Sequence, residues 1–220
     1  MPARTLQLRN FTSILEDIQI RFQAIAEKAI SGMTMPTTES EQLLKDIQTT
    51  QQTILQRCQK RGCQPADLSD AGYRGFLWLV FLSDPDHFKQ HLQFLSRFLQ
   101  KWKAKTHRVV SVRMYNSPFV FQCKPGRDGY TVTIGEGFVS ADPQTVQILV
   151  DCSVRSNRRN LTQLRALSRS AAYKRIMELI WQHSAQSSRS THGNYYDLQQ
   201  LFHKINAEYF QNRLEQPRLC

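Results

Sequence analysis

The chain has 220 residues, of which 40% are hydrophobic and include twelve Phe and three Trp, so we expect a packed core and not intrinsic disorder. Its formal net charge is +11, and its five irregularly spaced Cys suit the reducing, cytoplasmic compartment better than a disulfide framework. We see no secretory leader, and the longest apolar run, 75–82, is far shorter than the ~20 residues that span a bilayer, so we expect no membrane association.

The first hundred residues carry apolar side chains at the spacing of amphipathic helices. We predict helices over 6–30, 38–59, 69–82 and 85–104. The last of these opens with Ser83-Asp84-Pro85, which provides a capping side chain and places Pro in the first turn, where a missing N–H costs least. A helical domain is therefore predicted over residues 1–105.

Two pairs of residues in this part have a spacing that could suit metal ligands. His87 and His91 stand four residues apart and could share a helical face, but Phe88 occupies the place where a zincin needs Glu, and no third ligand is evident. We therefore predict an exposed or capping pair. Cys58 and Cys63 are at most half of a zinc knuckle, so no metal site is predicted.

After Thr106 the apolar period changes from 3.6 to 2, which is typical of strands. Segments 107–114, 119–123 and 130–134 are rich in β-branched and aromatic residues, and a turn with Pro and two Gly separates the last two. We predict a small antiparallel sheet of two or three strands, followed by a helix from Pro143 with Asp142 as its N-cap. Glu136, in a predicted turn, has no second carboxylate nearby in sequence, so no acid–base pair is predicted.

Positive charge gathers in two windows. Residues 89–113 contain seven basic and no acidic side chains, and residues 155–189 contain eight basic and one acidic. Clustered cations suit a polyanion, and Arg donates paired hydrogen bonds to phosphate, so we predict nucleic-acid binding; the alternative is that both windows are solvated faces. The candidate contacts are Arg155, Arg158, Arg159, Arg165, Arg169, Lys174, Arg175, Lys101, Lys103, Lys105, Arg108 and Arg113.

Two details refine this prediction. Trp102, within the first window, could stack a base, but a Trp at the end of a helix more often packs in a core, and packing is predicted. A helix-turn-helix in the second window is not favoured, because no Gly lies between Asp151 and His192 to make the tight turn.

The last stretch, 194–220, is the most informative. Its apolar residues recur at helical spacing, which predicts an amphipathic helix with one buried stripe, ending at Gln211-Asn212 before Pro217. This order resembles the opening of the SprT-like zinc metalloprotease domain, where a helix D-L-x-x-x-F-x-x-x-N-x-x-Y-F precedes L-x-x-P-x-L. The matching residues are Asp197, Leu198, Phe202, Asn206, Tyr209, Phe210, Leu214, Pro217 and Leu219. Residues 132–150 are similar to the segment upstream of the protease core in some bacterial SprT-like proteins.

The family's H-E-x-x-H zinc motif occurs nowhere in the 220 residues. The resemblance therefore implies the non-catalytic N-terminal portion of a DNA- or RNA-associated metalloprotease, with zinc expected only if a catalytic segment follows residue 220. No other catalytic motif is present, so we expect no enzymatic activity from this chain. The alternative is a free-standing nucleic-acid-binding or regulatory protein, whose terminal helix completes the core or meets a protein partner. In either case we predict an α+β fold, mainly helical, with a sheet-and-helix part over 106–220.

Overall fold

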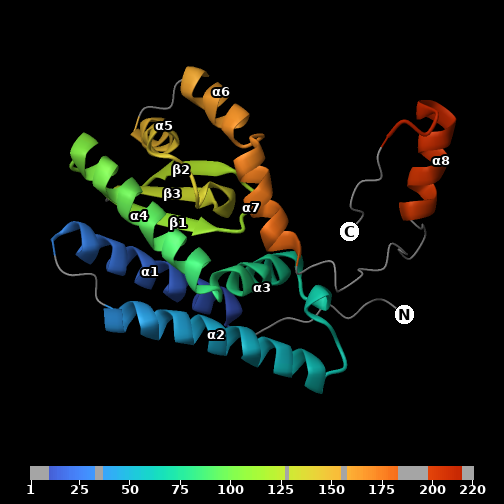
Figure 1. Cartoon of the computed structure of the whole chain (residues 1–220), viewed down its shortest axis with the longest axis horizontal. Coiled ribbons are helices and arrows are strands. Elements are labelled where there is room, and N and C mark those ends of the chain that lie inside the picture. Colours follow the sequence, from blue (N-terminus) through green and yellow to red (C-terminus); the bar gives the residue numbers. More distant parts are fainter. Residues whose placement is uncertain (1–9, 33–36, 127–128, 155–157, 183–197, 215–220) are drawn as a thin grey trace.

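The computed structural model describes residues 10–32, 37–126, 129–154, 158–182 and 198–214 (Figure 1). Helices dominate, and one small sheet lies among them, which confirms the predicted α+β, mainly helical class. Within the described residues, no helix combines the length and apolar character that a membrane span requires.

Four long helices make up the N-terminal half: α1 (Phe11–Ile30), α2 (Thr37–Lys60), α3 (Asp70–Leu82) and α4 (Pro85–Lys105), with a 3-10 turn, η1 (Pro65–Asp67), before α3. The predicted starts of α3 and α4 are confirmed by their caps, whereas α1 begins at Phe11, with residues 6–9 of its prediction outside the described residues, and α2 begins at Thr37, one residue before the predicted cap. Ser69 Oγ accepts from the backbone N–H of Gly72 at 3.2 Å, and Asp84 Oδ1 accepts from Asp86 and His87 at 3.0 Å each. The caps fix where the chain enters each helix, and therefore which side chains face inward.

The sheet consists of β1 (Val109–Tyr115), β2 (Phe121–Pro125) and β3 (Gly129–Gly135), in the order β1-β3-β2. β2 and β3 form the predicted antiparallel hairpin, but β1 runs parallel to β3, so the prediction of a wholly antiparallel sheet is wrong. The reason is that segment 116–120 crosses the end of β3, where Val120 O accepts from Gly135 N at 2.9 Å, and leads into β2 on the far side. β3 therefore fills the centre of the sheet.

The outer edge of β1 is closed by a side chain of α1. The Gln23 amide donates to Val110 O at 2.9 Å and its oxygen accepts from Val112 N at 2.8 Å. These two bonds take the place of a neighbouring strand, because the edge strand would otherwise leave its backbone groups unpaired. Helix α1 is thereby tied to the sheet as well as to the other helices.

The chain after the sheet forms η2 (Glu136–Phe138), α5 (Pro143–Val154), α6 (Arg158–Leu167) and α7 (Ala171–Gln182). Asp142 caps α5 as predicted, accepting from the backbone of Gln144 and Thr145 at 2.8 and 2.9 Å, and the bonds from Thr145 lower the pKa of its carboxyl group. Helix α5 packs between α4 and α6, whereas α7 packs on η2 and α3 (Figure 1).

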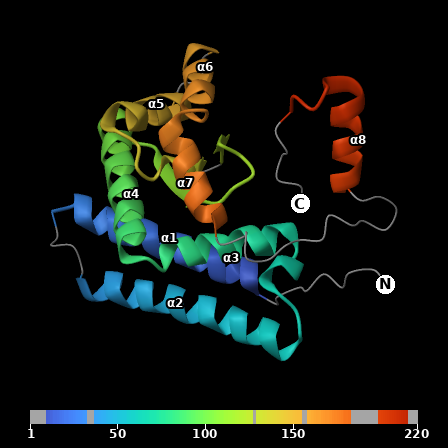
Figure 2. The same ribbon diagram turned by 45° about the vertical axis from the view of Figure 1, so that its right-hand side comes forward.

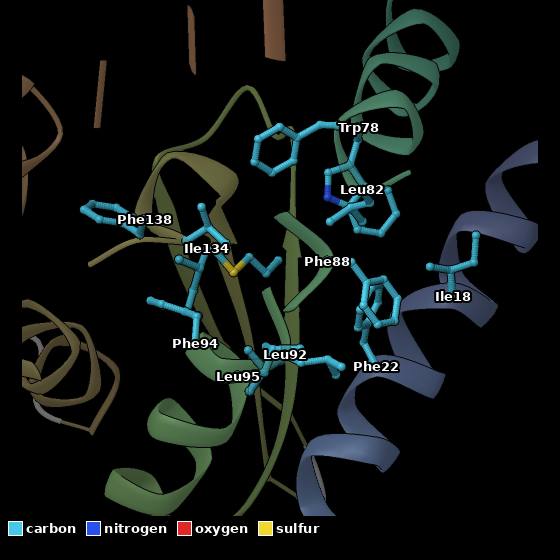
Figure 3. Close-up of a cluster of buried hydrophobic side chains, with 14 of the residues drawn as sticks. Ile18, Phe22, Trp78, Leu82, Phe88, Leu92, Phe94, Leu95, Ile134 and Phe138 are labelled. Atoms are coloured by element: carbon cyan, nitrogen blue, oxygen red, sulfur yellow. The ribbon is translucent and has the colours of Figure 1, made fainter. Parts of the chain in front are cut away.

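One hydrophobic core contains residues from both sides of the boundary predicted at residue 105. Figure 3 shows Phe22 and Trp78 of the N-terminal helices in the same cluster as Ile134 and Phe138 of the sheet region. The predicted packing of Trp102 is confirmed: its ring is buried and its N–H donates to the carbonyl of Arg108 at 2.7 Å.

Helix α8 (Leu198–Phe210) lies apart from the other helices in both views (Figures 1 and 2). The prediction that its apolar stripe is buried is wrong, since Leu201 and Ile205 are each 41% exposed and Tyr209 is 70% exposed. The reason is that none of the elements described in the structure packs extensively on α8.

The end of α8 follows the prediction. Gln211 and Asn212 have φ values of 52° and 59°, in the left-handed region that terminates a helix. Buried Asn206 then holds the chain that follows, because its side chain donates to Leu214 O at 2.9 Å and accepts from Leu214 N at 3.1 Å. Asp197 and Pro217 lie outside the described residues.

Candidate nucleic-acid interface

The second basic window forms two short helices joined by a tight bend. Backbone bonds from Ser168, Arg169 and Ser170 to carbonyls three or four residues earlier, each 3.0 Å, finish α6. Ser170 then caps α7, with its hydroxyl accepting from Tyr173 N at 3.3 Å. We call residues 158–175, from the start of α6 to the second turn of α7, the α6–α7 basic segment.

Both helices of this segment begin without an acidic residue in the first turn. Arg158 and Arg159 start α6, while Lys174 and Arg175 follow Tyr173 near the start of α7. The first turn of a helix already carries a partial positive charge, so Arg158 and Arg159 are unfavourably placed in the free chain and favourably placed for a bound anion, whereas Lys174 and Arg175 lie beyond the first turn of α7. The first turn of α6 thus adds its own positive charge to that of its cations.

The basic side chains of the segment that the structure describes point to solvent. Arg165, Arg169, Lys174 and Arg175 are all exposed, and none forms an ion pair with a carboxylate in the described parts of the chain. The side chains of Arg158 and Arg159, and all of Arg155, lie outside the description. Four of the predicted phosphate-binding side chains are therefore accessible to an external anion.

The opposite faces of the two helices anchor the segment. Leu164 of α6 is buried against the core, as are Ile176 and Ile180 of α7. Tyr173 packs its ring against Phe138, with centroids 4.8 Å apart, and burial, together with the nearby Glu136 carboxylate, raises the pKa of its hydroxyl. The cations consequently project from a fixed surface.

The lengths of α6 and α7 and the three-residue turn between them suit a helix-turn-helix. The packing does not, because α6 packs on α5 whereas α7 packs on η2 and α3. In a helix-turn-helix the two helices support each other so that the second can enter the major groove. The geometry therefore favours contacts to phosphates over insertion of a recognition helix.

Most predicted residues of the first basic window have partners within the chain. Lys101 donates to Gln147 at 3.2 Å and Lys105 pairs with Asp151, both on α5. Arg108 donates to the Tyr130 hydroxyl and lies 5.4 Å from the centre of its ring. Lys103 is exposed. Arg113 points elsewhere, toward Glu16 of α1 at 3.5 Å.

Most of these contacts have an explanation within the fold. Lys103 and Lys105 stand in the last turn of α4, where cations stabilise the negative end of a helix. Lys105 and Arg113 are also matched by carboxylates of the same chain. Two charges of this window are therefore already compensated within the chain, which makes it a weaker candidate for phosphate binding than the α6–α7 basic segment.

The structure contains a buried polar cluster that no pattern in the sequence predicted. Glu136 is fully buried; its Oε1 lies 2.8 Å from His91 Nδ1, and its Oε2 accepts from Trp78 Nε1 at 2.9 Å. The prediction of His91 as exposed or capping is wrong, because it faces this carboxylate and contacts the Phe22 ring, with centroids 4.3 Å apart. Glu136 is 45 and 58 residues from its two partners, so no local pattern could have revealed them.

This cluster is closed to substrates, since His91 and Glu136 are 1% and 0% exposed. Its evident role is to hold η2 against α3 and α4, and η2 in turn supports α7. His87, the other residue of the predicted pair, is only partly buried and places Nδ1 3.2 Å from Phe81 O.

Cys58 and Cys63 have a structural explanation. Gly62 ends α2 in the left-handed conformation with φ 62°, and Cys63 N donates to Cys58 O at 3.0 Å across the turn. Burial, together with neighbouring Cys63, raises the pKa of the Cys58 thiol to about 11. Across the described ranges, no three His, Cys, Asp or Glu side chains are grouped closely enough to hold a metal ion.

A cavity of about 740 Å³ lies between α1, the start of α3 and the end of β1. Its lining mixes Glu16 and Asp70 with Arg74 and Arg113, and the ion pair between Glu16 and Arg113 spans two of its walls. This balance of charge favours neither an anionic nor a cationic ligand.

No protein-family model, curated protein or solved structure matches the chain. The interpretation of the basic segment therefore depends on its geometry and electrostatics.

Proposed function

We propose that this chain binds nucleic acid through the phosphates, using the α6–α7 basic segment, and that it does so without catalysing a reaction. The observation that carries this proposal is that four exposed cations follow one another from the last turn of α6 to the second turn of α7 without a carboxylate partner among the described residues: Arg165, Arg169, Lys174 and Arg175. In the free chain these like charges repel one another, and a bound polyanion relieves that repulsion.

The extent of the segment favours a polyanion over a single small anion. Helix α6 has 10 residues, which at ~1.5 Å per residue gives a length of about 15 Å, and α7 continues beyond the bend. Successive phosphates of one strand are spaced more closely than this, so several can be contacted at once. Arg165 and Arg169 lie between the two helix starts and connect them.

We further propose that the chain is the N-terminal portion of a SprT-like, metalloprotease-related protein. The supporting observation is at the end of α8, where Asn206, one of the residues that carries the resemblance, clamps Leu214, another of them. The alternative is a free-standing binding or regulatory protein. Sequencing beyond codon 220 separates the two: an in-frame H-E-x-x-H supports the protease relationship, and an immediate stop codon removes it.

Binding is tested by fluorescence anisotropy with labelled DNA and RNA oligonucleotides over a range of salt concentrations. A variant with Arg165, Arg169, Lys174 and Arg175 changed to Ala is expected to bind more weakly. The slope of log K against log salt should also become shallower, by about 0.7–0.9 for each phosphate that the variant no longer neutralises.

The matched control removes four positive charges from exposed positions on α2 or just after it: Lys45, Arg57, Lys60 and Arg61, all changed to Ala. This control should keep most of the wild-type slope. Equal slopes for wild type and the α6–α7 variant, or equal reductions in the two variants, would mean that the α6–α7 basic segment does not contact phosphates.

A further inference from the structure

An exposed aromatic residue belongs to a segment that lies near α7. Phe119, in the segment between β1 and β2, is 55% exposed, although a ring of this size would gain by burial. Isolated exposed apolar residues are common on protein surfaces, so exposure alone assigns no role. Phe119 differs from such isolated residues in two respects: hydrogen bonds fix its backbone, and its segment lies next to α7.

The backbone that carries Phe119 is fixed by hydrogen bonds on both sides. Phe119 N donates to Ser117 Oγ at 3.0 Å, and the next residue, Val120, accepts from Gly135 N at 2.9 Å. Earlier in the segment, the Asn116 amide donates to Arg74 O at 3.3 Å. The ring is thus presented on a braced segment, and little conformational entropy would be lost when a ligand stacks on it.

The same segment lies against α7. A Cβ atom at Gly135 would be 2.8 Å from the Tyr173 hydroxyl and 3.4 Å from the Phe119 carbonyl oxygen, so both residues lie against this glycine. Tyr173 is followed directly by Lys174 and Arg175, the exposed cations near the start of α7. The backbone of Phe119 therefore lies close to the Tyr173 hydroxyl, so the exposed ring is carried by a segment next to the helix that bears two of the proposed phosphate contacts.

We infer that Phe119 is a stacking platform for an unpaired base, and that the ligand of the α6–α7 basic segment is single-stranded nucleic acid. This inference rests on the proposed function. A cationic track with an aromatic ring alongside it is how single strands are bound without sequence preference, since every base has a face that can stack. In a duplex the bases are stacked on each other and a ring at the surface has none to contact.

The test compares a labelled single strand with a hairpin duplex of the same length and charge, using wild type, Phe119→Ala and Phe119→Trp. Phe119→Ala should weaken single-strand binding by about 5- to 150-fold, and leave duplex affinity and the salt slope unchanged. Phe119→Trp should retain single-strand binding. The matched control is Ile20→Ala, which removes an apolar side chain, 68% exposed, from α1.

Several outcomes would overturn the inference: unchanged single-strand affinity in Phe119→Ala, or an equal loss for single strand and duplex. Salt-dependent binding that is lost in the Arg165, Arg169, Lys174, Arg175 variant but unaffected by Phe119→Ala would leave the proposed function standing and remove only the stacking platform. Failure of the wild-type chain to bind either oligonucleotide would remove both. If Phe119→Ala instead abolished binding of a protein partner while nucleic-acid binding persisted, the ring would belong to a protein interface.

Discussion

Removal of the Glu136 carboxylate should be among the most damaging single changes to this fold. In Glu136→Ala, the Trp78 N–H and the His91 ring nitrogen, 2.9 and 2.8 Å from the carboxylate oxygens, lose their partner in a region sealed from solvent. An unsatisfied buried polar group costs about 1–3 kcal/mol, and Glu136→Ala leaves two such groups. We expect the free energy of unfolding to fall by about 3–5 kcal/mol, which is within the range that two such groups give.

Urea unfolding followed by circular dichroism measures this change. For a chain of this size, the expected loss corresponds to a drop in Tm of about 6–20 °C. The control is Glu16→Ala, which breaks a surface ion pair with Arg113 in which both side chains are about half exposed, and should cost less than about 1 kcal/mol. Glu136→Gln should lower the free energy of unfolding less than Glu136→Ala, because the amide oxygen can still accept a hydrogen bond from Trp78 Nε1.

The reasoning would be refuted if Glu136→Ala unfolded within about 1 kcal/mol of wild type at an unchanged dependence on urea. That result would mean that the carboxylate does not hold the buried cluster together. A change in the urea dependence itself would instead show that the native or unfolded state had changed in compactness, and calorimetric enthalpies would then be needed to compare the variants.

Three other predictions concern single contacts. Gln23→Leu should lower the free energy of unfolding by about 1–3 kcal/mol, because it removes the two hydrogen bonds to the edge of β1. Gln19→Leu, one turn earlier on α1, should lower it much less. Equal losses would mean that the Gln23 amide does not stabilise the edge of β1. Gly137→Ala would place a Cβ 2.5 Å from the Tyr173 ring and should lower the free energy of unfolding by about 1–3 kcal/mol. The double variant Gly137→Ala, Tyr173→Ala should be destabilised by less than the sum of the two single variants. Burial, together with neighbouring Cys63, raises the pKa of the folded Cys58 thiol from 9.0 to about 11, so this thiol ionises at lower pH in the unfolded chain than in the folded one. The free energy of unfolding should therefore fall as pH rises from 9.0 to about 11. The urea midpoint should fall less steeply over this range in Cys58→Ala than in wild type.

The parts of the fold that were predictable from sequence are those that depend on neighbours along the chain. Ser69, Asp84 and Asp142 mark helix starts because a capping side chain bonds to N–H groups two or three residues ahead. The left-handed pair Gln211-Asn212 marks a helix end for a similarly local reason. The two basic windows were visible in the charge count alone.

What could not be predicted depends on contacts between distant segments. The parallel pairing of β1 with β3 follows from the path of residues 116–120, which no periodicity encodes. The spacing of His87 and His91 suggested one shared face, but tertiary packing buried His91 against Glu136 and left His87 near the surface. For the candidate interface, sequence showed which residues are cationic, and the structure showed which have partners within the chain.

The bonds that cross residue 105 have a consequence for making this protein in pieces. A polypeptide ending at Lys105 would present the Trp78 and His91 nitrogens without Glu136, and its counterpart would lack the Gln23 amide that seals the edge of β1. Each half alone should be insoluble or aggregated. When both fragments are produced in one cell, however, they should associate into a soluble complex. The junction after α4 is therefore a suitable place to divide the chain for a fragment-complementation assay.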